Sequence, residues 1–162
     1  MNTTYPTCYS KSIQTRLVLP PDTNHHDSIF GGKVLAYIDE IAAISAMKHS
    51  QGEVVTASFD SVDFVSPAYA GDMIELEAMV TGTGRTSMEV YVRVVSRNVK
   101  TGAKKLTTES FVTMVAIDAE GNPKEVPGVE PETDFERHLF ETGPIRQEHR
   151  KQKRALSKKR RG

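Results

Sequence analysis

The stretch that decides the fold is IFGGKVLAYIDEIAAISAMKH, residues 29–49. After its two glycines, apolar side chains recur at the three- and four-residue intervals of a helix. One stripe consists of Val34, Ile38, Ile41 and Ser45, with Leu35, Ala42 and Ala46 beside it. Gly52 closes the pattern. These features predict a helix over residues 33–49, the main helix of the body.

Strand-like segments lie on both sides of this helix. Residues 12–19 precede it and end at Pro20-Pro21. Four further runs with strand character follow it, at 54–64, 73–80, 87–99 and 106–117. Short glycine- or proline-containing breaks separate these runs, which is typical of an antiparallel meander. One long helix followed by antiparallel strands is an α+β pattern.

A single helix packed on one sheet leaves apolar surface and an edge strand uncovered. Oligomerisation is the usual way to cover such an edge. We therefore expect at least a dimer.

The charge of the chain is divided between two segments. The 162 residues contain 21 Lys and Arg and 21 Asp and Glu, so the formal net charge is zero. Residues 146–162 hold nine of the basic residues and one acidic residue, a net charge of +8, which leaves −8 on residues 1–145. This basic tail could bind RNA, an anionic membrane or an acidic partner, but we expect it to be solvated or to contact the acidic body of its own oligomer.

Composition excludes several classes of protein. Cys8 is the only cysteine, which excludes intrachain disulfides and cysteine-rich zinc sites. No apolar run approaches the length of a membrane span, and residues 1–10 lack the apolar segment of a signal peptide. With no tryptophan and 7% aromatic residues, the chain is a poor candidate for a base-stacking nucleic-acid platform. We expect a cytoplasmic protein.

Residues at the helix start could carry chemistry. Gly31 and Gly32 let the backbone approach a ligand closely, and the free N–H groups of a first helical turn suit a developing oxyanion. Asp39 lies about two turns further on, with apolar or small neighbours. A carboxylate there either finds a partner or titrates high, as a general base should. A surface carboxylate or a hydrogen bond at a dimer interface is the alternative.

The sequence resembles the hotdog-fold acyl-CoA thioesterases, in particular the cytosolic long-chain and broad-range branch. The resemblance runs from about residue 12 to residue 126. It is carried, in order, by Asp22-Thr23-Asn24, Ile29-Phe30-Gly31-Gly32, Ile38-Asp39-Glu40, residues 54–60 with Phe64, Pro67, Gly71-Asp72 and Gly84-Arg85-Thr86-Ser87.

The resemblance implies a hotdog domain over residues 1–130, in which a curved antiparallel sheet wraps the long helix. Residues 131–162 would then be a charged tail, helical at first and interrupted at Gly143-Pro144, or disordered. It also implies homodimers with shared active sites, with three dimers in a hexamer. Acyl-CoA would be the substrate and free CoA a product, with no separate cofactor and no metal.

The resemblance also assigns roles to individual residues. Asp39 would be the catalytic carboxylate, with Asn24 supplied by the opposite subunit. Backbone amides near Gly31 and Gly32 would hold the thioester oxygen, and Thr56 would position water or substrate. The CoA phosphates and adenosine would pass Arg85, Thr86 and Ser87. Whether Asp39 activates water or attacks the carbonyl stays open, and we favour the general base.

Two alternatives accompany this reading. A non-catalytic acyl-CoA-binding or regulatory module could use the same fold. His25, His26 and Asp27 suggest a metal site, but adjacent histidines in an extended segment point apart and no third ligand cluster follows. We therefore interpret them as a solvated turn.

Overall fold

The computed structural model describes residues 3–162. Its elements, in chain order, are β1 (Thr4–Pro6), α1 (Thr7–Ser10), β2 (Ser12–Leu17), the 3-10 turn η1 (Pro20–Asp22), α2 (Gly31–Ser50), β3 (Glu53–Phe64), β4 (Met73–Thr83), β5 (Ser87–Arg97), β6 (Lys104–Ile117), β7 (Gly128–Glu130) and α3 (Asp134–Arg161).

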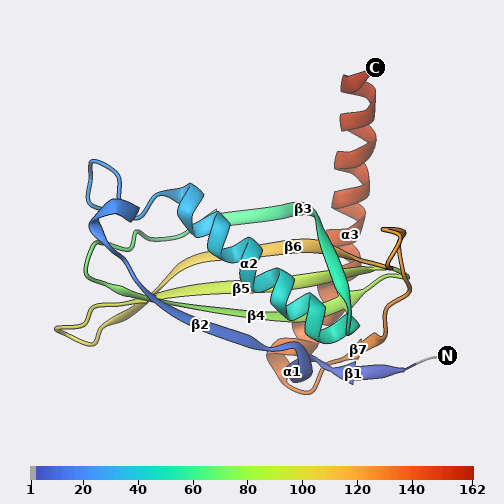
Figure 1. Ribbon diagram of the computed structural model, residues 1–162, viewed down its shortest axis with the longest axis horizontal. Coiled ribbons are helices and arrows are strands. Elements are labelled where there is room, and N and C mark those ends of the chain that lie inside the picture. The colour runs from blue at the N-terminus through green and yellow to red at the C-terminus, as the bar shows by residue number, and fades with distance from the viewer. Residues whose placement is uncertain (1–2) are drawn as a thin grey trace.

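Five strands form one antiparallel sheet in the order β2-β4-β5-β6-β3 (Figure 1). The predicted meander is confirmed for β4, β5 and β6, which pair as neighbours in chain order. It is wrong for β3, which pairs with β6 at the far edge instead of lying beside β4. Alternating side chains identify a strand but do not specify its neighbour.

Helix α2 crosses one face of this sheet (Figure 1). All four residues of the predicted stripe, from Val34 to Ser45, are buried. Val34, Ile38 and Ile41 form part of one core with the inward residues of β4, β5 and β6. Gln51 ends the helix in the left-handed conformation, with φ of 56°. The predicted α+β architecture is thus confirmed, with the helix extended to residues 31–50.

Helix α3 crosses the opposite face and projects beyond the edge strand β3 (Figure 1). A capping box begins the helix, in which the Thr133 side chain accepts a hydrogen bond from the backbone N–H of Glu136. Leu139 packs with Met79 and Tyr91 of the sheet. The helix continues through Pro144, where the sequence predicts an interruption. The proposed domain boundary after residue 130 stays a prediction.

Strand β3 is long, lies at an edge of the sheet and carries exposed apolar side chains. Val55 is 47% exposed and Phe59 38% exposed. The register with β6 shifts twice, after Thr56 and after Phe59, which marks β-bulges. An uncovered apolar edge of this length favours pairing with a second copy. No helix among residues 3–162 is long and apolar enough to cross a membrane.

Candidate active site

Asp39 and Thr56 meet between α2 and β3. The Thr56 hydroxyl donates a hydrogen bond of 2.6 Å to Oδ1 of Asp39, and Sδ of Met114 lies 3.5 Å from the same hydroxyl. Asp39 is half-buried and Thr56 is exposed. The sequence did not show whether the Asp39 carboxylate has a hydrogen-bond partner, and in the structure that partner is Thr56. The hydroxyl fixes one carboxylate oxygen and leaves the other available to a water molecule.

The neighbouring carboxylate, Glu40, is in a different environment. Its Oε1 accepts a hydrogen bond of 2.7 Å from Arg16, and its side chain is 53% exposed. The Arg16 guanidinium also lies 4.1 Å from the ring centroid of Tyr37. Glu40 is therefore a solvated, ion-paired carboxylate.

Asn24 lies in the turn that precedes α2. Its side-chain oxygen accepts hydrogen bonds from the backbone N–H groups of His26, at 2.8 Å, and Ser28, at 3.4 Å. The Ser28 hydroxyl donates to the same oxygen at 3.2 Å. The carboxamide is thus held by its oxygen, and its NH2 group has no hydrogen-bond partner within residues 3–162. Asn24 can therefore offer two N–H donors to another molecule.

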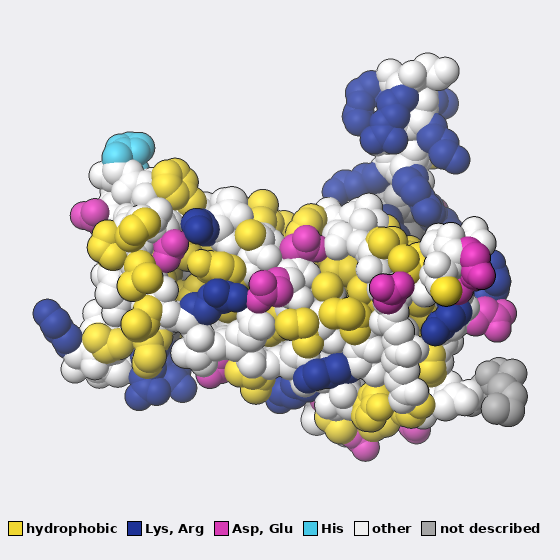
Figure 2. All heavy atoms as spheres, viewed as in Figure 1, with side chains coloured by type: hydrophobic (Ala, Val, Ile, Leu, Met, Phe, Trp, Pro, Cys, Tyr) yellow, Lys and Arg dark blue, Asp and Glu magenta, His cyan; other side chains and the backbone are white. Residues whose placement is uncertain are grey.

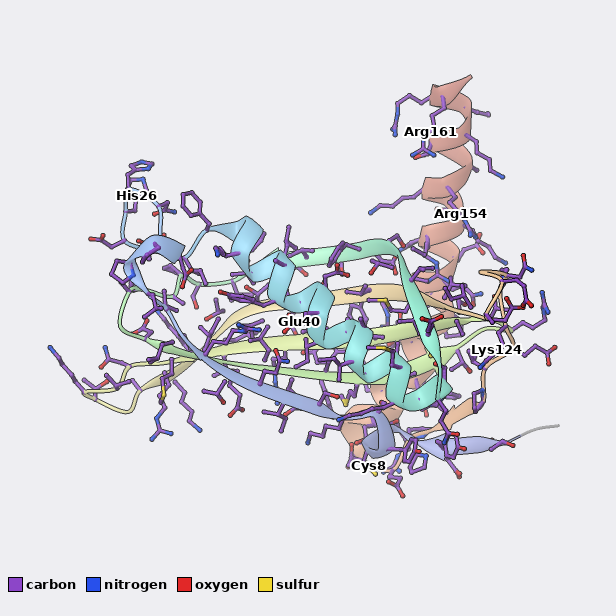
Figure 3. All side chains as sticks on the ribbon, in the orientation of Figure 1. Cys8, His26, Glu40, Lys124, Arg154 and Arg161 are labelled. Atoms are coloured by element: carbon purple, nitrogen blue, oxygen red, sulfur yellow. The ribbon has the colours of Figure 1, made fainter. Side chains whose placement is uncertain are left out.

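One chain does not bring Asn24 to Asp39. Asp39 is eight residues past the first residue of α2, which is about 12 Å along a helix. Asn24 lies before the start of the same helix. Figure 3 labels His26, two residues after Asn24, and Glu40, next to Asp39. His26 lies beyond one end of α2, whereas Glu40 lies near the middle of the helix. A site that uses both side chains needs a second subunit.

Gly31 and Gly32 begin α2 beside an apolar cavity. Phe30, at the N-cap, makes no side-chain capping bond, so the first amides of the helix are not covered by a cap. The cavity has a volume of about 360 Å³. Its lining residues are Ile29, Gly31, Val34, Phe64, Val65, Ser66, Pro67, Ala68, Thr107 and Thr108. A Cβ on Gly31 would lie 3.3 Å from Cζ of Phe64, so a larger residue would narrow the cavity.

Arg85, Thr86 and Ser87 form the turn between β4 and β5. Their carbonyl oxygens accept hydrogen bonds from the backbone N–H groups of Val126, Ala116 and Gly84 respectively. A Cβ at Gly84 would lie 2.7 Å from the Ser87 hydroxyl, so a larger residue there would displace the Ser87 side chain. Arg85 is exposed, and its Nη1 lies 3.8 Å from Glu125, a weak surface contact. The carbonyls of the turn are thus engaged, while the Arg85 side chain is exposed and those of Thr86 and Ser87 are half-buried.

The histidine pair and Cys8 lie outside this arrangement. The rings of His25 and His26 have centroids 3.9 Å apart, so the prediction that they point apart is wrong. The segment is a turn, with Asp27 at a φ of 60°, and is not extended. Within residues 3–162 no group of three potential metal ligands occurs. A hydrogen bond from Cys8 to Glu132 raises the pKa of the Cys8 thiol, which disfavours the thiolate.

Sequence reasoning missed a polar cluster under α3. Arg146 donates to both carboxylate oxygens of Glu89, at 2.8 and 2.9 Å, and its guanidinium stacks on Phe111 at 4.1 Å. One turn further, Arg150 approaches Asp60 at 3.8 Å. These pairs join segments far apart in the chain, so only their charge was visible in the sequence.

Comparisons with known proteins give the family. The model of the Thioesterase superfamily matches residues 26–103. The uncharacterized acyl-CoA thioester hydrolase YkhA of Bacillus subtilis is 47% identical over 91% of this chain and 86% of its own length. The crystal structure of an apo-hexameric acyl-CoA thioesterase is 66% identical, with a TM-score of 0.93 over 95% of this chain and 99% of that chain. The acyl-CoA hydrolase of Staphylococcus aureus, solved with butyryl-CoA and CoA, is 48% identical, with a TM-score of 0.92 over 96% of this chain and 95% of that chain. The chain therefore belongs to the thioesterase superfamily and is a hotdog-fold thioester hydrolase.

Proposed function

We propose that this protein hydrolyses acyl-CoA to CoA and a carboxylic acid, with Asp39 as the general base. The observation that carries the proposal is the 2.6 Å hydrogen bond from Thr56 to Asp39, which orients the carboxylate. The free oxygen of Asp39 takes a proton from a water molecule as that water attacks the thioester carbon. The carbon–sulfur bond then breaks, and the departing CoA thiolate takes the proton back from Asp39. Gly31 and Gly32 begin α2, about 12 Å from Asp39 on the same helix, so the opposite subunit supplies their amides together with Asn24. These amides stabilise the oxyanion, and the positive end of α2 adds to this effect. The acyl chain occupies the 360 Å³ cavity beside Gly31.

Residue spacing in a relative supports this assignment. The Staphylococcus aureus hydrolase has been solved with alanine in place of an asparagine, an aspartate and a threonine, which are separated by 15 and 17 positions. Asn24, Asp39 and Thr56 are separated by the same 15 and 17 positions. The three residue types also occur in the same order.

The active site is shared between two subunits in this proposal. Asn24 and Asp39 are apart in one chain, and β3 offers an apolar edge for pairing. Asn24 of one subunit then donates its carboxamide N–H groups to the substrate or water beside the other subunit's Asp39. Three such dimers would form a hexamer, the assembly of the 66% identical relative. Arg85, Thr86 and Ser87 contact the CoA phosphates, no further cofactor is needed, and the location is cytoplasmic.

Release of free thiol from short, medium and long acyl-CoAs tests the proposal. Turnover on at least one chain length is expected. Tight binding of all of them without thiol release would instead identify a non-catalytic acyl-CoA-binding module.

Mixed oligomers test the shared site. The Asp39→Ala and Asn24→Ala variants should each lose most activity. Co-expression with two different affinity tags isolates oligomers that contain both variants, and random pairing makes about half of their dimers mixed, with one copy of each variant. Such dimers should regain part of the activity, because one of their two sites then holds both wild-type residues. A mixed dimer without rescue would place both residues of each site in one subunit.

A further inference from the structure

Helix α3 shares a cavity with the turn that we assign to CoA. This cavity of about 170 Å³ lies between the β4–β5 turn and α3. Gly84 and Ser87 line it from the turn, and Pro144, Gln147 and Arg150 line it from the helix. The two segments come together only because α3 crosses the face of the sheet opposite α2 (Figure 1).

Arg150 has unused donor capacity in this cavity. Its side chain is only 17% exposed, and its closest carboxylate, Asp60, lies 3.8 Å away, beyond hydrogen-bond distance. Asp60 already accepts hydrogen bonds from Ser58 at 2.6 Å and Thr113 at 2.5 Å. Within residues 3–162 the Arg150 guanidinium donates no hydrogen bond. A guanidinium offers five N–H donors in a fork that matches phosphate oxygens.

The rest of the cavity suits an anion with a flat apolar part. Its one carboxylate, Glu89, is neutralised by Arg146 and accepts a further hydrogen bond from Thr81 at 3.0 Å. Phe140 and Pro144 provide apolar surface. A nucleotide has both properties, since its base is flat and its phosphates are charged.

The cavity lies at the same end of the sheet as the catalytic pair. Thr56 pairs with Met114 across β3 and β6, and Met114 pairs with Met88 across β6 and β5. Ser87 directly precedes Met88. The backbone at Thr56 on β3 is therefore two inter-strand distances, about 10 Å in total, from the start of β5 at the turn. An acyl-CoA whose thioester lies at Asp39 can pass the turn and place its nucleotide on the α3 face.

We propose that Gln147 and Arg150 of α3 bind the 3′-phosphoadenosine diphosphate end of CoA, together with the β4–β5 turn. Arg150 pairs with a phosphate, and Gln147 hydrogen-bonds the base or the ribose. This inference rests on the proposed acyl-CoA hydrolysis. It makes α3 part of the substrate site, although its sequence shows only a basic tail.

Two substrates that share an acyl group test this proposal. Acyl-CoA carries the nucleotide and acyl-pantetheine lacks it. Arg150→Ala should raise KM for acyl-CoA about tenfold, the effect of one charge-assisted hydrogen bond, with kcat nearly unchanged. Both constants for acyl-pantetheine should stay at the wild-type values. Gln147→Ala should give a smaller rise in KM, of two- to threefold. Inhibition by 3′-phosphoadenosine 5′-diphosphate should weaken in parallel.

Two matched variants separate binding from structure. Asp60→Asn removes the charge opposite Arg150 and keeps the guanidinium, so KM should not rise. Lys159→Ala removes one positive charge nine residues along α3, half a helical turn away from the Arg150 side, and should also leave KM unchanged. Equal losses on both substrates in Arg150→Ala would show a structural role and overturn the proposal. Unchanged kinetics in that variant would overturn it too, whereas a wild-type protein inactive on every acyl-CoA would refute the proposed function itself.

Discussion

Helices α2 and α3 cross opposite faces of one sheet and are held there by different forces. Helix α2 buries eight of its 20 residues, among them Ile38 and Ile41. Helix α3 buries only Leu139 among 28 residues. Its firmest attachment is the ion pair between Arg146 and Glu89. Beyond the sheet, its end is covered by Lys and Arg side chains, whereas charges of both signs are scattered over the body (Figure 2).

The difference fits the two roles that we propose. The apolar stripe of α2 is buried against the sheet, so the helix cannot shift without opening the core. Asp39 therefore keeps its position relative to Thr56. A helix held by a few polar contacts leaves donors such as Arg150 free for a ligand. The buried face thus positions the chemistry, and the polar face recognises the substrate. The following variants test this division, from the largest expected effect to the smallest.

The largest effect is expected at Asp39. Asp39→Asn keeps the shape of the side chain and removes its basicity, so kcat should fall about 10³-fold. Thiol release at saturating acyl-CoA measures this, and circular dichroism should show an unchanged fold. Glu40→Gln, the matched change at the next residue, should leave kcat near the wild-type value because Glu40 is solvated. Equal losses in both variants would contradict the assignment of the base to Asp39.

On the α3 face, Arg146→Ala should affect stability more than chemistry. It leaves Glu89 buried without its partner and should lower the free energy of unfolding by about 3 kcal/mol. Denaturant unfolding measures the loss. Arg137→Ala removes the exposed pair with Asp134 and should cost less than about 1 kcal/mol. A similar, small cost for both variants would mean that the ion pair does not hold α3 to the sheet.

The same two faces show what the sequence could predict. The α2 stripe and the strand runs were readable because local periodicity determines them. The position of β3 in the sheet could not be predicted, because the local sequence pattern of a strand does not specify which strand it pairs with. Helix α3 was expected to break at Pro144, but tertiary contacts override that preference. Arg146, two residues past the proline, donates to the Leu139 carbonyl at 2.5 Å and to Glu89 of the sheet, so contacts on both sides of Pro144 hold the helix in place.

The site was predictable to a similar degree. The residue types at Asn24, Asp39 and Thr56 followed from a resemblance, and folding brings Thr56 to Asp39. The apolar cavity beside Gly31 and the free guanidinium of Arg150 had no sequence signal. Both depend on segments that are distant in the chain and meet only in the folded molecule.

A smaller catalytic effect is expected at Thr56. Thr56→Val keeps the volume and removes the hydroxyl that orients Asp39, so kcat should fall about tenfold, the effect of one lost hydrogen bond to a charged group. Thr56→Ser keeps the hydroxyl and should retain most activity. If the two variants behave alike in thiol release, the hydroxyl does not orient the base.

His49 links the two faces and should make stability depend on pH. It is fully buried at the end of α2, and its Nε2 lies 2.9 Å from the Pro127 carbonyl, in the segment that leads to α3. Desolvation lowers the pKa of His49 below its ordinary value of 6.5, and the hydrogen bond opposes this only in part. The unfolded chain therefore takes up the proton first as pH falls. Stability should be full above about pH 6.5 and decline below it.

Replacing His49 by glutamine tests whether this histidine causes the pH dependence of stability. His49→Gln can still donate to Pro127 and does not titrate, so its unfolding free energy should change less than that of the wild type between pH 7.5 and pH 5.5. Thermal unfolding across this range measures the difference. Identical slopes would mean that other groups cause the acid sensitivity.

The smallest effect is expected where α3 has left the sheet. Residues 158–162 are exposed, and deleting them should change the free energy of unfolding by less than about 0.5 kcal/mol. Lys158 repels Arg154 one turn earlier, which destabilises the helix, while cations near a helix C-terminus are favourable, so the two contributions oppose each other. Deletion from residue 146 onward also removes the Arg146–Glu89 pair and should cost as much as Arg146→Ala. A large loss from the short deletion would show that the end of α3 contacts another subunit, because no strand among residues 3–162 lies beneath it (Figure 1).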